Sequence, residues 1–124
     1  MNLKMIGVVA LGGAIGSVLR FMLMSGIGHF WKSHFPLSTL VVNVLGSFAI
    51  GALVEILMQH QGSNLLWRGF FIVGVLGGFT TFSTFALDAG LLIEKEQLFL
   101  AGLYLSGSVI ISILAFFAGM ALFR

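Results

Sequence analysis

Cysteine is absent from this chain of 124 residues, and charged residues make up only 8% of it. Without cysteine the chain has no disulfide, no thiolate metal site and no cysteine nucleophile. Three histidines and four carboxylates are all that remain for other site chemistry. This small supply of reactive side chains argues against an enzyme.

Basic residues are also few and scattered. The six lysines and arginines give a net charge of +2, but they form no basic run that could follow a nucleic acid backbone. The sequence therefore predicts no nucleic acid partner.

Apolar residues dominate instead, at 59% of the chain with a mean hydropathy of +1.13. A helix needs about 20 apolar residues to cross the hydrocarbon core of a bilayer. Four stretches have this length, with short polar connections between them, and we expect them to form one four-helix domain over residues 1–124. The predicted spans are residues 5–24, 37–58, 67–93 and 98–122. The sequence thus predicts an all-α integral membrane protein without a soluble domain.

The basic residues are evenly divided between the two sides of the membrane that four spans imply. One side has Lys4, Arg68 and Arg124, and the other has Arg20, Lys32 and Lys95. An excess of lysine and arginine on the cytoplasmic side normally sets orientation. With three facing three, we expect insertion in both orientations and an antiparallel homodimer with dual topology. The alternative is that one basic residue near a boundary decides the orientation.

The third span contains GGFTTFSTFALD, residues 77–88. Glycine and β-branched threonine disfavour continuous helix, so we expect a break near mid-span that frees carbonyls suited to a small hard cation. The alternative is a continuous helix whose threonine hydroxyls bond to the preceding turn. Phe79, Phe82 and Phe85 recur every three residues, and their positive ring edges can attract an anion weakly. Simple packing is the alternative for these rings.

Polar side chains occur inside two other spans. Asn43 lies in the second span and Ser47 follows one turn later, while Tyr104, Ser108 and Ser112 share one stripe of the fourth. Such a stripe either offers donors to a ligand or joins helices by hydrogen bonds. The ionisable residues within spans are Arg20, Glu55 and Asp88, all near predicted span ends, where side chains can also snorkel to the head groups.

Small residues should let the helices approach closely, because lipid supplies no hydrophobic drive for helix association. The glycines concerned are Gly12, Gly13, Gly16, Gly46, Gly51, Gly102 and Gly107.

In four segments the chain resembles the CrcB/Fluc family of fluoride channels. The segments are GGAIGSVLR (residues 12–20), STLVVNVLG (38–46), GGFTTFSTF (77–85) and GSVIIS (107–112). The third is the most specific. The resemblance implies a passive fluoride channel in the bacterial inner membrane, built as an antiparallel dual-topology dimer with two pores.

The same resemblance implies roles for individual residues. Asn43, Phe82, Phe85, Tyr104, Ser108 and Ser112 would line the fluoride pore, with Arg20 at a vestibule. The backbone carbonyls of Gly77 and Thr80 from both copies would hold a structural sodium ion at the dimer centre.

Two other functions stay open. One is a small proton-coupled drug exporter, but such a protein should carry a glutamate within its first span, and residues 5–24 contain no acid. The other is a membrane subunit without transport activity, which would tolerate apolar replacements of Asn43 and the phenylalanine pair.

Overall fold

The computed structural model describes residues 2–60 and 65–124, and almost all of this part is helical. The elements are α1 (Leu3–Phe30), α2 (Leu37–Gln59), α3 (Leu65–Arg68), the π-helix η1 (Gly69–Leu76), α4 (Gly77–Phe79), α5 (Phe82–Glu94) and α6 (Leu98–Leu122).

Among the described residues, four helical segments are long and apolar enough to cross a membrane. They are Leu3–Phe30, Leu37–Gln59, Leu65–Glu94 and Leu98–Leu122. The third segment is composite, since it joins α3, η1, α4 and α5. The expectation of an all-helical chain with four membrane-spanning segments is confirmed at this level.

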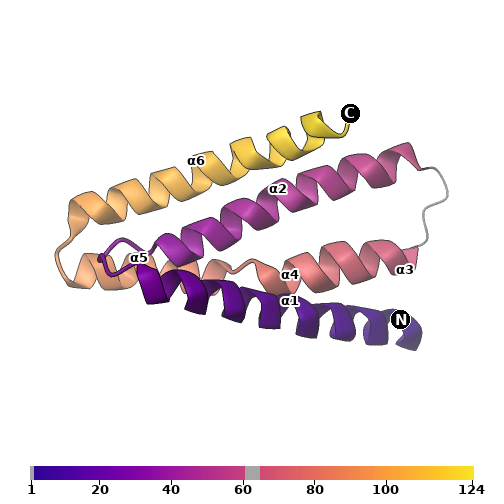
Figure 1. Cartoon of the computed structure of the whole chain (residues 1–124), viewed down its shortest axis with the longest axis horizontal. Helices are drawn as coiled ribbons and strands as arrows, with labels where there is room; N and C mark the ends of the chain where they lie inside the picture. The colour runs from indigo at the N-terminus through magenta and orange to yellow at the C-terminus, as the bar shows by residue number, and fades with distance from the viewer. Residues whose placement is uncertain (1, 61–64) are drawn as a thin grey trace.

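The segments pack as two pairs. α1 lies along η1 and α4, and α2 lies along α6. Both chain ends lie at the same end of the bundle as α3, while the turn from α5 to α6 lies at the opposite end (Figure 1). Because α2 and α6 both start at the α5 end, they run in the same direction (Figure 1).

Both pairs depend on glycine at the point of closest approach. A Cβ on Gly16 would overlap the carbonyl of Val75 in η1, and one on Gly51 would overlap the carbonyl of Phe116 in α6. On the opposite side of the second crossing, a Cβ on Gly119 would overlap the carbonyl of Phe48. These contacts bring backbone against backbone, which only a residue without a side chain permits.

Two of the glycines expected at close contacts do not make one within the chain. A Cβ added to Gly102 or Gly107 would meet nothing within 4 Å. α6 uses Gly119 instead, which the sequence analysis did not single out. The reason is the register of α6 on α2, which the small-residue pattern alone does not determine.

The third segment is interrupted beside α4. Thr80 and Thr81 have extended backbone, with φ/ψ of −86°/159° and −150°/118°, and α5 begins at Phe82. The Thr81 hydroxyl accepts a hydrogen bond from the N–H of Thr84 at 3.1 Å and so caps α5. Phe79 therefore lies before the interruption, and Phe82 and Phe85 lie after it.

α1 is longer than the first predicted span. It continues to Phe30, about 15 Å past Arg20 at 1.5 Å per residue, so Arg20 is not near the end of this helix. The helix continues through Ser25, Gly26 and Gly28, although all three are weak helix formers. The helix ends where the N–H of Trp31 donates to the carbonyl of Ile27 at 2.8 Å.

Glu55 has partners within the chain. It is buried in α2, and its carboxylate lies 3.6 Å from the guanidinium of Arg124. The side-chain amide of Gln59 donates to the same carboxylate at 3.4 Å and to the carbonyl of Phe123 at 2.8 Å. These contacts attach the C-terminal end of α6 to α2.

The turn between α5 and α6 supplies a stability prediction. Glu96 has φ of 58°, a left-handed conformation that costs a residue with a side chain about 1 kcal/mol. Glu96→Gly is therefore expected to raise the free energy of unfolding by about 1 kcal/mol, measured by thermal unfolding in detergent. Lys95→Gly is the matched control, because Lys95 has φ of −86° and glycine there brings only an entropic loss. Equal effects of the two substitutions would contradict the prediction.

Candidate functional site

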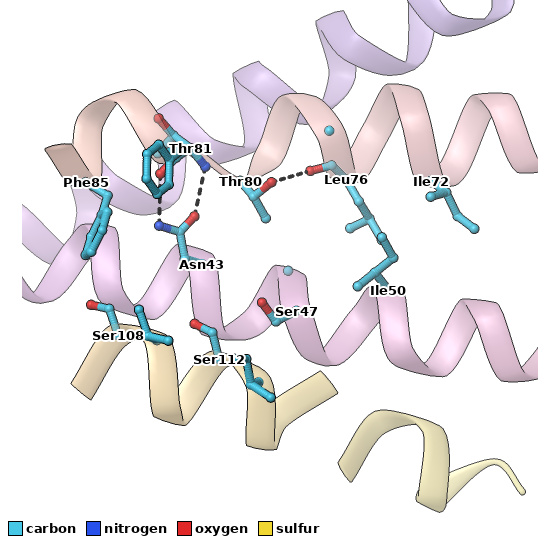
Figure 2. A pocket seen from close by; sticks show the side chains of 15 residues that line it. Asn43, Ser47, Ile50, Ile72, Leu76, Thr80, Thr81, Phe85, Ser108 and Ser112 are labelled. Carbon is cyan, nitrogen blue, oxygen red and sulfur yellow. Dashed lines mark hydrogen bonds between the residues drawn. The ribbon is translucent and has the colours of Figure 1, made fainter. Parts of the chain in front are cut away.

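A cavity of about 490 Å³ lies between α2, the third segment and α6 (Figure 2). Its polar side chains are Asn43, Ser47, Thr80, Thr81, Ser108 and Ser112. The rest of the lining is glycine or apolar and includes Phe82 and Phe85. Of the predicted site residues, the cavity brings together Asn43, Gly77, Thr80, Phe82, Phe85, Ser108 and Ser112.

Asn43 holds the interruption of the third segment against α2. Its side-chain N–H donates to the carbonyl of Thr81 at 3.0 Å, and its side-chain oxygen accepts from the N–H of Thr81 at 2.8 Å (Figure 2). A primary amide has two N–H donors, so one stays available for a ligand. Asn43 thus fixes the extended backbone and can still donate into the cavity.

The interruption leaves two carbonyls without their helical donors. In a continuous helix the carbonyl of Gly77 would accept from Thr81, but that N–H donates to Asn43. The carbonyl of Thr80 would accept from Thr84, but that N–H donates to the Thr81 hydroxyl. Gly77 and Thr80 both line the cavity. Within the described residues no three histidine, cysteine or carboxylate side chains gather.

Three aromatic rings lie in sequence from the cavity inward. The ring centroids of Phe82 and Phe85 are 5.5 Å apart, and those of Phe85 and Tyr104 are 5.1 Å apart. Phe82 is 79% exposed in the single chain, whereas Phe85 is buried. Phe82 therefore presents its ring to whatever covers this face of the chain, and Phe85 is held by the core behind it.

Tyr104 does not line the cavity, although it shares its helix with Ser108 and Ser112. It is fully buried behind Phe85, and its hydroxyl donates to the carboxylate of Asp88 at 3.1 Å. This bond gives Asp88 a partner in α6 and joins α5 to α6. The four-residue spacing correctly predicted that these hydroxyls lie on one side of α6. It could not predict that Phe85 covers Tyr104.

Ser108 has the most unusual environment of the site. Its side-chain oxygen is buried and has no hydrogen-bond partner among the described residues. A buried hydroxyl without a partner costs free energy. In a cavity wall, this points to a ligand or water that completes its bonding.

Arg20 is separate from this group. It lies on α1, half-exposed, and is not part of the cavity lining. The structure therefore places the predicted vestibule residue on a different helix from the donors, and its vestibule role stays a prediction.

Sequence reasoning gave no role to Thr81 and no specific role to Ser47. Thr81 acts through its backbone and as a helix cap, and residue type does not encode a backbone bond to a side chain 38 positions away. A signal for the cap was present, because Thr81 is followed by a helical run. Ser47 lies one helical turn after Asn43, and that spacing was the available signal.

Comparison with known proteins gives a consistent answer. The family described as "CrcB-like protein, Camphor Resistance (CrcB)" matches residues 7–120. A protein named "Fluoride-specific ion channel FluC" from Agrobacterium fabrum is 47% identical over 119 residues, covering 96% of this chain and 95% of the relative. Proteins of the same name from Rhodospirillum centenum and Stutzerimonas stutzeri are each 43% identical over 122 residues; 98% of this chain is covered in both cases, with 97% and 98% of the respective relatives. The chain therefore belongs to the CrcB family.

Proposed function

We propose that this chain forms a fluoride-selective passive channel that lowers cytoplasmic fluoride from within the bacterial inner membrane, and that it is not an enzyme. The family match and the names of the relatives support this function. The structural observation that carries it is the buried Ser108 hydroxyl without a partner, beside Asn43 in a mostly apolar cavity.

The chemistry of the lining suits a small anion that is bound weakly. Hydroxyl and amide N–H groups donate hydrogen bonds, and aromatic ring edges add a weak positive field. Among the described residues that line the cavity there is neither a carboxylate to repel an anion nor a cation to retain it. Weak binding at several positions is what conduction requires.

The driving force needs no energy source other than the membrane potential. Neutral HF crosses bilayers and ionises in a near-neutral cytoplasm, which traps fluoride inside. An inside-negative potential then favours exit of the anion by about 2.3 kcal/mol per 100 mV. A passive pore is therefore sufficient for fluoride resistance.

The proposed assembly is an antiparallel homodimer with two pores. One chain leaves the Phe82 ring 79% exposed beside the cavity, so a second copy is needed to close the pore wall. Equal numbers of basic residues on the two sides support insertion of both orientations.

A sodium ion would fit between the two copies as a structural ion. The carbonyls of Gly77 and Thr80 have lost their helical donors, and a second chain would add the same pair. Carbonyl oxygens are suitable ligands for a hard monovalent cation. The ion would neutralise these dipoles and join the interruptions of the two copies.

The test is fluoride efflux from liposomes that contain the purified protein, followed with a fluoride electrode after addition of a potassium ionophore. We expect fast electrogenic release of fluoride and little release from chloride-loaded vesicles. Phe82→Ile should slow fluoride release, because it keeps an apolar side chain but removes the ring edge. A well-folded protein that releases no fluoride electrogenically would overturn the channel; release that needs a proton gradient would instead favour the exporter.

A further inference from the structure

Polar residues on α2 and α6 are spaced in register. On α2 they are Thr39, Asn43 and Ser47, and on α6 they are Tyr104, Ser108 and Ser112. In each helix the spacing is four residues, or about 6 Å along the axis. The two helices run in the same direction (Figure 1), so the residues form three successive pairs. The two members of each pair are the same number of positions apart in the sequence.

The close approach of α2 and α6 establishes this register. At one end of the series, Thr39 and Tyr104 are both almost completely buried. One turn beyond Ser47 and Ser112, a Cβ on Gly51 would overlap the carbonyl of Phe116. The intermediate pairs, Asn43 with Ser108 and Ser47 with Ser112, are the ones whose members all line the cavity.

The hydroxyls of Ser47, Ser108 and Ser112, which all line the cavity, have no hydrogen bond to a described residue. Ser17 and Ser106 donate to the carbonyl four residues earlier, at 2.8 and 2.7 Å. Ser47 makes no such bond to a described residue. Its side chain lies on the cavity side of α2, in the region that Ser112 enters from α6 (Figure 2).

We propose that Ser47 is a pore residue that forms, with Ser112, a second anion-binding position about 6 Å from the one at Asn43 and Ser108. This inference rests on the proposed fluoride channel. Two hydroxyl donors bind the anion there more weakly than the amide and hydroxyl of the first position do. Because Gly51 and Phe116 close the space between α2 and α6 directly beyond, Ser47 and Ser112 are the last donors before the ion leaves this groove.

The experiment compares the fluoride efflux rates of four proteins in liposomes. Ser47→Ala is expected to slow efflux about 10-fold, because one hydrogen bond to a charged ligand is lost in a water-poor site. Ser47→Thr keeps the hydroxyl and should stay within about 3-fold of the original protein. Ser106→Ala is the matched control, since Ser106 is exposed and bonded to its own helix, and its rate should be unchanged.

A double-substitution cycle tests whether Ser47 and Ser112 act together. If they bind one ion, Ser47→Ala combined with Ser112→Ala should slow efflux less than the product of the two single effects. If the double variant slows efflux by the full product of the two single effects, the two serines do not share one anion-binding position. Equal rates for Ser47→Ala and the original protein, or equal slowing by Ser47→Ala and Ser47→Thr, would overturn the role of the hydroxyl.

The outcomes separate this inference from the function on which it rests. If the original protein releases no fluoride, the channel itself fails; if it conducts and Ser47→Ala conducts equally, only the Ser47 position fails. Should Ser47→Ala not fold, Ser47→Cys decides the question, because it keeps the side-chain volume with a much weaker donor. Slow efflux through folded Ser47→Cys supports the proposal, and unchanged efflux contradicts it.

Discussion

Replacing Asn43 with aspartate is expected to lower fluoride efflux about 100-fold or more, with the helical content unchanged. The substitution removes the N–H that donates to the Thr81 carbonyl and the second N–H of the same amide. It also adds a negative charge where the anion must pass. At about 5 Å and an effective dielectric constant near 20, like-charge repulsion is about 3 kcal/mol, which corresponds to a factor of about 100 in rate.

The efflux assay and a circular dichroism spectrum together measure this result. Asn2→Asp is the matched control, because Asn2 caps α1 by accepting a bond from the N–H of Lys4 at 2.9 Å, and aspartate caps a helix equally well. That variant should conduct normally. Fluoride efflux within 3-fold of the original rate in folded Asn43→Asp would show that the Asn43 amide is neither a required donor nor a required clamp for Thr81.

Much of the fold could be predicted because membranes constrain length and polarity together. Four apolar stretches of about 20 residues leave few alternatives to four helices, and the structure has four such segments among its described residues. The exact course of the backbone was harder to predict. The extension of α1 to Phe30 and the π-helical geometry of Gly69–Leu76 depend on packing partners that are distant in sequence.

The candidate site was predictable where a side chain acts through its own helix. Asn43, Ser108 and Ser112 were found because polar residues in apolar helices are few and share a face. Thr81 was missed because it contributes a backbone N–H and carbonyl. Phe79 was grouped with Phe82 and Phe85 by its spacing, but the extended residues between them remove it from their face. The dimer, the sodium ion and the pore roles of these residues stay predictions.

Tertiary pairing also explains why ionisable residues were difficult to interpret. Glu55 on α2 is paired with Arg124, two residues after the end of α6. Asp88 on α5 accepts from Tyr104 on α6. Composition and a position near a span end indicate only that a charged side chain is tolerated there, not which residue pairs with it. The contact that makes burial acceptable depends on which helices are neighbours.

The crossing of α2 and α6 is the part of the fold on which the cavity depends, and Gly51→Ala is expected to disrupt it. The added Cβ would overlap the Phe116 carbonyl, and since a backbone group cannot rotate away, the helices must separate. We expect a loss of about 3 kcal/mol in the free energy of unfolding, measured by thermal unfolding in detergent. Separation also moves Ser108 and Ser112 away from Asn43, so fluoride efflux should fall in the same variant.

Gly7→Ala is the control, because a Cβ there meets nothing within 4 Å and alanine favours helix. Gly119→Ala examines the same crossing from α6, where the added Cβ would overlap the Phe48 carbonyl. Because both substitutions force the same two helices apart, their combined cost should be smaller than the sum of the single costs. If Gly51→Ala unfolds at the same temperature as the original protein, the close approach of α2 and α6 is wrong, and with it the register that pairs Ser47 with Ser112.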